Sequence, residues 1–248
     1  MIILVTNDDG IASPALLKLR DELQPLGRVI IVAPDRDQSA TSHSLTLNRP
    51  FRIHRHEEDI YSVDGTPTDC VVAACHGLLA ERPGLVVSGI NQGPNMGEDV
   101  FYSGTVAAAI EGTLQGSPAI AASLVTRELT DFAGPARFVG LLARTVLERG
   151  LSARRVLNVN IPHRPWDQVK GVKITRLGSR VYQDTLIRKV DPRGRDYYWI
   201  GGQDAVWEHL EGSDFNAVDS GYVSVTPMRL DLTDEGALEG LSDWNLVT

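Results

Sequence analysis

Cysteine, aromatic residues and basic residues are all scarce in this chain of 248 residues. It has two cysteines, 6% aromatic residues, and 24 Lys and Arg against 32 Asp and Glu, which gives a formal net charge of −8. One cysteine pair cannot form a disulfide framework or a zinc site alone, so Cys70 and Cys75 are expected to be core thiols. The acidic balance excludes a protein that coats duplex nucleic acid, because Lys and Arg supply most of that affinity.

Long apolar runs are also missing. Val29–Ala33 is typical of the longest ones, whereas a membrane-spanning helix needs about 20 apolar residues. The segment Met1–Val5 lacks the basic n-region of a signal peptide, and Asn7, Asp8 and Asp9 follow before a signal-peptide core could form. We therefore expect a cytoplasmic protein without a membrane partner.

Short apolar runs alternate with helical patterns over residues 1–162, as in crossover units around a parallel sheet. The predicted strands are Ile2–Thr6, Arg28–Ala33, Leu85–Ser88, Ile120–Ser123 and Val156–Ile161, with a small antiparallel ribbon over Leu45–Asn48, Phe51–His56 and Ile60–Val63. Four helices are predicted. The first follows a cap at Ser13, the second and third run over Thr66–Leu79 and Thr105–Gln115, and the fourth extends from Thr130 or Asp131 to about Arg149.

The pattern changes after Pro162. Val181–Lys189 and Tyr197–Ile200 mix aromatic, β-branched and polar residues around turn residues at 191–194, which predicts a projecting hairpin. Tyr222–Thr226 is a last predicted strand before an acidic C-terminal segment. We therefore expect one α/β domain over 1–248, with a mostly parallel sheet in 1–162 and a β-rich appendage in 163–248.

Polar side chains follow three of the predicted parallel strands. Asp8 and Asp9 come after the first strand, Ser39 after the second and Asn91 after the third. Ligands of open α/β sheets bind at these carboxyl ends, and adjacent carboxylates repel unless a cation lies beside them. This all-oxygen set suits Mg²⁺ or Mn²⁺. The alternative is that Asp-Asp-Gly is only a turn.

A second cluster precedes the helix that starts near residue 105. Ser103, Gly104 and Thr105 can direct backbone N–H groups and hydroxyls to an anion such as phosphate at the positive end of this helix. A plain helix cap is the alternative. His43, in a loop rich in hydroxyl groups, could carry protons or form only a structural hydrogen bond.

Six segments of the chain carry distinctive motifs: Ile3–Gly10, Ala33–Ser39, Tyr61–Cys70, Val87–Asn95, Tyr102–Ala109 and Gly221–Pro227. Together they closely resemble the SurE, or survival protein E, family of metal-dependent nucleotidases. The resemblance spans nearly the whole chain.

The resemblance implies a Rossmann-like three-layer sandwich with one divalent ion bound by Asp8, Asp9, Ser39 and Asn91. It implies a phosphate pocket formed by Asn95, Ser103, Gly104 and Thr105. It also implies a homodimer or homotetramer with exchanged C-terminal segments.

The activity expected from this resemblance is hydrolysis of nucleoside monophosphates, with Asp8 or Asp9 accepting a proton from water. The resemblance extends the expected substrates to 3′-monophosphates and polyphosphate. Two alternatives stay open: a nucleotide sensor without catalysis, and a phosphatase that forms an aspartyl-phosphate, although Asp8-Asp9 lacks the Asp-x-Asp spacing common in that chemistry.

Overall fold

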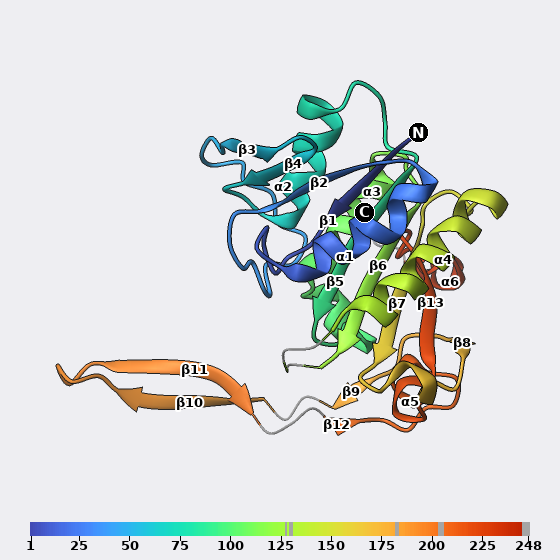
Figure 1. Ribbon diagram of the computed structural model, residues 1–248. Coiled ribbons are helices and arrows are strands. Elements are labelled where there is room, and N and C mark those ends of the chain that lie inside the picture. Colours follow the sequence, from blue (N-terminus) through green and yellow to red (C-terminus); the bar gives the residue numbers. More distant parts are fainter. Residues whose placement is uncertain (127, 129–130, 182–183, 203–205, 245–248) are drawn as a thin grey trace.

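A nine-stranded sheet forms the centre of the protein (Figure 1). The computed structural model describes residues 1–126, 128, 131–181, 184–202 and 206–244. The strands of the sheet are β1 (Ile2–Thr6), β2 (Arg28–Pro34), β3 (Ile53–Glu57), β4 (Ile60–Val63), β5 (Leu85–Gln92), β6 (Ala119–Val125), β7 (Arg155–Pro162), β8 (Val172–Ile174) and β13 (Val223–Arg229). Their order is β3-β4-β2-β1-β5-β6-β7-β13-β8.

Most neighbouring strands are parallel, as the sequence predicts. Only β3 with β4 and β13 with β7 pair antiparallel within this sheet. Helices α1 (Pro14–Leu23) and α4 (Ala133–Arg149) cover one face, and α2 (Pro67–Ala73) and α3 (Gly104–Leu114) cover the other. The predicted α/β class with helices on both sides of a mostly parallel sheet is confirmed.

The alternation of side chains along each strand divides the core in two. In β1, Ile3 and Val5 pack with Leu16 of α1, whereas Leu4 packs with Val106 of α3 on the opposite face. The second cluster contains Cys70, and both cysteines are free thiols, as expected. Among the described residues, every helix is too short or too polar to span a bilayer.

Local capping explains where several elements start. Thr66 accepts a hydrogen bond from the backbone of Asp69, whose carboxylate accepts one from the backbone of Thr66, so the predicted cap of α2 is confirmed as a capping box. The helical segment continues as a π-helical turn over Ala74–Leu78. Ser13 precedes α1 as predicted, but its side chain forms no capping hydrogen bond.

One predicted strand and two predicted boundaries were wrong. Leu45–Asn48 is not a strand, because the backbone of Thr46 instead donates to the Asp69 carboxylate, at 2.9 Å. Strand β5 extends past Ser88 to Gln92, so Asn91 lies within the strand rather than in a loop. Helix α4 starts at Ala133, and Thr130 lies outside the described residues.

The region after Pro162 contributes to two different structures. Strands β8 and β13 join the central sheet, whereas β10 (Asp184–Val190) and β11 (Asp196–Gly202) form the predicted hairpin, which projects away from the sheet (Figure 1). Residues 182–183 of the predicted hairpin lie outside the described residues. The remaining elements are β9 (Arg180–Val181), β12 (Val206–Trp207), α5 (Asp214–Asp219) and α6 (Glu235–Ser242).

The contact between α3 and β5 leaves no room for a larger residue at position 112. A Cβ atom on Gly112 would lie 2.7 Å from Cγ2 and 2.8 Å from Cβ of Val86. We expect Gly112→Ala to destabilise the fold by about 1–3 kcal/mol, because the branched Val86 cannot move aside. Urea unfolding of this variant beside Gly240→Ala, where a Cβ meets nothing within 4 Å, measures the effect. Equal midpoints for the two variants would contradict it.

Candidate active site

The strand order reverses beside β1. The chain passes from β1 to β2 on one side and later returns to β5 on the other, and both strands are parallel to β1. Such a switch point opens a crevice at the carboxyl ends of the strands. Asp8 and Asp9 leave β1 at this crevice, and Asn91 lies near the end of β5. The fold therefore brings together the strand ends on which the sequence prediction rests.

The turn after β1 is held by its own polar groups. The side chain of Asn7 donates to the Gly10 carbonyl at 3.0 Å and accepts from the Gly10 backbone N–H at 3.1 Å. Gly10 has φ +92°, and a Cβ there would lie 2.9 Å from the carbonyl carbon of Arg36. The Gln38 N–H donates to the Asp8 carbonyl at 2.8 Å, so the loop after β2 lies directly against this turn.

Asp8 is buried against the first turn of α3. Its side chain accepts a hydrogen bond from the Thr105 hydroxyl, and Asp8 is only 4% exposed. Gly104 allows this approach, because a Cβ at residue 104 would lie 2.9 Å from Asp8 Cβ and 3.1 Å from Asp8 Oδ2. Thr105 is fully buried, and in this structure its hydroxyl binds the Asp8 carboxylate. Its predicted contact with substrate phosphate stays a prediction.

Three carboxylates concentrate negative charge at this point. Burial raises the pKa of Asp8, and burial together with the charge of Asp8 raises the pKa of Asp9 to about 6. Asp37 adds a smaller repulsion that raises both pKa values. The Asp9 carboxylate accepts one long hydrogen bond, from the Gln92 N–H at 3.4 Å. A bound cation would offset this repulsion and favour the ionised carboxylates.

Ser39 and Asn91 supply neutral oxygen atoms. The Ser39 hydroxyl and backbone N–H both donate to Asp37, at 2.6 and 2.8 Å. The Asn91 amide nitrogen donates to the Gly93 carbonyl at 3.0 Å. Among the described residues, nothing donates to the Asn91 side-chain oxygen, which is the atom that a hard cation would bind.

A cavity of about 790 Å³ opens at these residues. Five of the eight predicted site residues line it: Asp8, Ser39, Asn91, Asn95 and Ser103. Asp9, Gly104 and Thr105 contact residues of this lining: Asp9 accepts a hydrogen bond from Gln92, and Gly104 and Thr105 lie against Asp8. The structure therefore gathers the predicted metal and phosphate residues around one crevice.

Two further residues at this cavity were not predicted from the sequence. Arg180 and Asp99 line the cavity and form an ion pair at 2.7 Å. Asp214, which is 0% exposed, accepts hydrogen bonds from the Gly97 and Gly178 backbones, both at 2.9 Å. Asp214 thereby joins the two segments that carry this pair. The three residues are far apart in the sequence, and no local pattern marks them.

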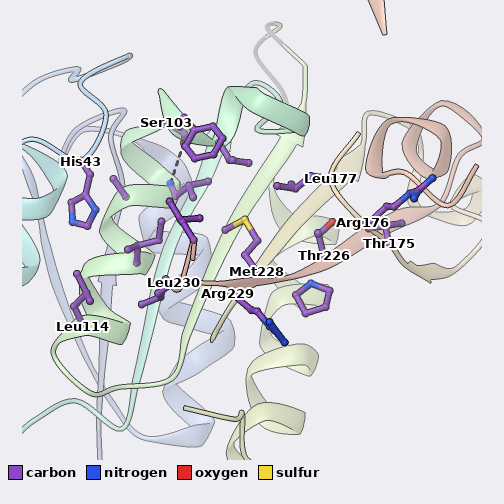
Figure 2. A pocket seen from close by; sticks show the side chains of 17 residues that line it. His43, Ser103, Leu114, Thr175, Arg176, Leu177, Thr226, Met228, Arg229 and Leu230 are labelled. Atoms are coloured by element: carbon purple, nitrogen blue, oxygen red, sulfur yellow. Dashed lines mark hydrogen bonds between the residues drawn. The ribbon is translucent and has the colours of Figure 1, made fainter. Parts of the chain in front are cut away.

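A second cavity, of about 920 Å³, lies between α3 and β13. Its walls are mainly apolar, and Figure 2 shows His43 and Leu114 on one side with Thr175 and Arg176 on the other. The His43 Nε2 lies 2.9 Å from the Glu111 carboxylate, and this contact lowers the pKa of Glu111. Because His43 contacts Glu111 here, the structure shows the structural hydrogen bond that was one of the two alternatives for this residue.

The donor set of the first cavity fits a hard divalent ion. No group of three or more His, Cys, Asp or Glu side chains within the described ranges is arranged to bind a metal. The candidate set instead combines Asp8 and Asp9 with an amide and a hydroxyl oxygen. The available Asn91 oxygen and the repelling carboxylates are the two observations that support this fit.

Comparisons with known proteins agree along the whole chain. The family model described as survival protein SurE matches residues 3–184. A 5′-nucleotidase SurE of Geotalea daltonii is 51% identical over 99% of this chain and 100% of its own length. The Geobacter sulfurreducens 5′-nucleotidase SurE is also 51% identical, over 99% of this chain and 94% of its own length.

The folds also agree. The crystal structure of a SurE protein from Aquifex aeolicus superposes with a TM-score of 0.88 at 43% identity, covering 98% of this chain and 99% of that one. Fold, family match and full-length identity therefore lead to one conclusion: this chain belongs to the SurE survival-protein family.

Proposed function

We propose that this protein is a metal-dependent 5′-nucleotidase that hydrolyses nucleoside monophosphates to nucleoside and phosphate. The observation that carries the proposal is that the buried carboxylate Asp8 and Ser103, the cap residue of α3, line the same cavity. Relatives named 5′-nucleotidase SurE share about half of their residues with this chain over its whole length. We extend the proposal to 3′-monophosphates and polyphosphate as further substrates.

Asp8, Asp9, Ser39 and Asn91 are proposed to hold one divalent ion, Mg²⁺ or Mn²⁺. When bound, such an ion supplies Lewis-acid polarisation of a phosphoryl oxygen and lowers the pKa of a water molecule. Thr105 keeps Asp8 in place through its hydroxyl. Asp9 is the more accessible of the two carboxylates, and we assign it as the group that accepts the proton of the attacking water.

The substrate phosphate is proposed to bind between α3 and Asn95. The Ser103 hydroxyl oxygen accepts a hydrogen bond from the Val106 N–H at 3.0 Å, which leaves its own O–H able to donate into the cavity. The N-terminus of α3 at Gly104 adds the positive end of the helix dipole. These donors stabilise the charge that develops on the phosphoryl oxygens. We assign the rest of the cavity, which the ion pair of Arg180 and Asp99 lines, to the nucleoside.

A turnover panel tests the proposal against its alternatives. Purified protein is incubated with 5′- and 3′-monophosphates of each base under Mn²⁺, and inorganic phosphate is measured. Hydrolysis predicts phosphate release, whereas a nucleotide sensor predicts calorimetric binding without release. Mass spectrometry of acid-quenched enzyme detects an aspartyl-phosphate. Binding without turnover, or a trapped phospho-enzyme, would overturn the proposed mechanism.

We further propose a single cytoplasmic domain over 1–248 that assembles as a homodimer or homotetramer through segments after residue 162. The hairpin exposes Leu186, Trp199 and Ile200 at 67%, 62% and 83%, and the C-terminal segment exposes Trp244 at 65%. Exposed apolar side chains of this size are typical of interaction sites. Light scattering of the full chain tests the proposal, and a monomer at micromolar concentration would contradict it.

A further inference from the structure

Three polar side chains lie in the middle of the sheet beside the candidate active site. Asn158 and Asn160 belong to β7 and Ser123 belongs to β6, and all three are 0% exposed. Their strand neighbours Val159 and Ile161 are apolar core residues. Burying an amide or a hydroxyl is unfavourable unless it forms hydrogen bonds, so the bonds that these three groups form indicate why they are there.

All three bind the same residue, Asn95. Asn160 accepts from the Asn95 backbone N–H at 2.9 Å and donates to the Asn95 carbonyl, also at 2.9 Å. Asn158 donates to that carbonyl at 2.8 Å. A carbonyl oxygen is only an acceptor, so the amide nitrogens of both residues must face it. The side chains of β7 thus hold both polar backbone groups of Asn95.

Ser123 holds the side chain of Asn95. The Asn95 amide nitrogen donates to the Ser123 hydroxyl oxygen at 2.7 Å, and Asn95 is 6% exposed where it lines the cavity. An amide nitrogen carries two N–H groups, so this bond leaves the second one for a ligand. Residues of β6 and β7 therefore fix both the backbone and the side chain of Asn95.

The same positions form a row across the sheet. Ser123 is the cross-strand neighbour of Asn91 in β5 and of Asn160 in β7. The row therefore connects a proposed metal ligand with the support of a proposed phosphate ligand. The Asn158 side-chain oxygen is buried without a hydrogen-bond partner among the described residues. Burying an amide oxygen without a partner is unfavourable, so the presence of Asn158 favours a role for its amide nitrogen, which binds the Asn95 carbonyl.

We propose that Ser123, Asn158 and Asn160 are positioning residues that hold the amide of Asn95 where it binds the phosphoryl group of the substrate. The inference rests on the proposed function and deepens it, because it states how a loop residue is fixed at the site. The three residues act through Asn95 and do not touch the substrate themselves.

Ser123→Ala tests this proposal, with Ser88→Ala as its matched control. Ser88 is also 0% exposed and lies in the neighbouring strand β5, but its hydroxyl has no hydrogen-bond partner among the described residues. We expect Ser123→Ala to lower kcat/KM for AMP about tenfold and to weaken binding of inorganic phosphate by a similar factor. The Mn²⁺ concentration for half activation should stay within about twofold. Ser88→Ala should match the wild type.

A double-mutant cycle with Asn95→Ala separates positioning from a general structural effect. If Ser123 acts through Asn95, Ser123→Ala should have no further effect in the Asn95→Ala background. The proposal is overturned if Ser123→Ala behaves like Ser88→Ala, or if its effect is unchanged in that background. A wild type that releases no phosphate would instead refute the proposed function, and calorimetry with inorganic phosphate would still test the positioning.

Discussion

Replacing Asp9 with Asn should abolish metal-dependent phosphate release, with a loss of at least about a thousandfold in kcat/KM for a nucleoside monophosphate. Asparagine keeps the shape of the side chain but removes the charge that holds a cation and the basic oxygen that accepts a proton. The initial rate of phosphate release under saturating Mn²⁺ measures the effect. Near-normal turnover of this variant would refute the proposed role of the carboxylate pair.

A stability measurement distinguishes this loss from misfolding. Without metal, Asp8 and Asp9 are neighbouring carboxylates that burial disfavours in their charged form. Removing one charge should therefore leave the Tm of the chelator-treated protein unchanged or raise it. Asp21→Asn is the matched control, because the Asp21 side chain is 61% exposed on α1 and its loss should affect neither turnover nor Tm. A lower Tm for Asp9→Asn would point to a structural role instead.

Gly104→Ala should lower kcat/KM about a hundredfold, because a small displacement of a catalytic group has effects of this size. The added Cβ would lie 2.9 Å from Asp8 Cβ and 3.1 Å from Asp8 Oδ2 and Pro67 Cγ, so Asp8 must move. The backbone at residue 104 is helical, and alanine favours helix over glycine by about 1 kcal/mol. This gain offsets part of the cost of the overlap, so the loss should be much larger in turnover and Mn²⁺ affinity than in stability.

Gly240→Ala provides the control for this substitution. Gly240 also lies in a helix, α6, and a Cβ there meets nothing within 4 Å. It should keep wild-type turnover and gain a small amount of helix stability. If Gly104→Ala were as active as Gly240→Ala, the close approach of α3 to Asp8 would have no functional importance.

Local patterns predicted the elements that carry the proposed site. The apolar run Ile2–Thr6 is β1 without correction, and the predicted cap at Thr66 is present because Asp69 completes a capping box. The carboxyl ends of parallel strands lie at the same edge of the sheet, independently of the conformation of the loops that connect them. The sequence could therefore place Asp8 and Asn91 near each other before any register was known.

The supports of the site depend on contacts that only the folded chain creates. Asn95 and Asn160 are 65 residues apart, and their pairing depends on how the loop after β5 meets β7. The pair of Arg180 and Asp99 spans 81 residues. Two asparagines alternating within an apolar strand were a visible signal, but the sequence alone does not say which group they bind. The strand at Leu45–Asn48 was wrongly predicted for the same reason: a contact between distant residues decides the backbone there, since Asp69 binds the Thr46 backbone.

The negative charge of the chain is compatible with a phosphate substrate under this proposal. Two of its carboxylates, Asp8 and Asp9, would attract a cation, and the cation with the end of α3 would attract the substrate locally. A cavity of about 790 Å³ suits a small phosphate ester rather than a duplex. Duplex DNA should therefore neither bind nor inhibit the enzyme at physiological salt.

Metal dependence of turnover is the decisive test of the proposed metal site at Asp8 and Asp9. The protein is stripped with a chelator, dialysed, and assayed for phosphate release from AMP while Mn²⁺ or Mg²⁺ is titrated back. We expect no release above background in the stripped protein and full recovery with one ion bound per chain. Undiminished phosphate release in the presence of excess chelator would contradict the account.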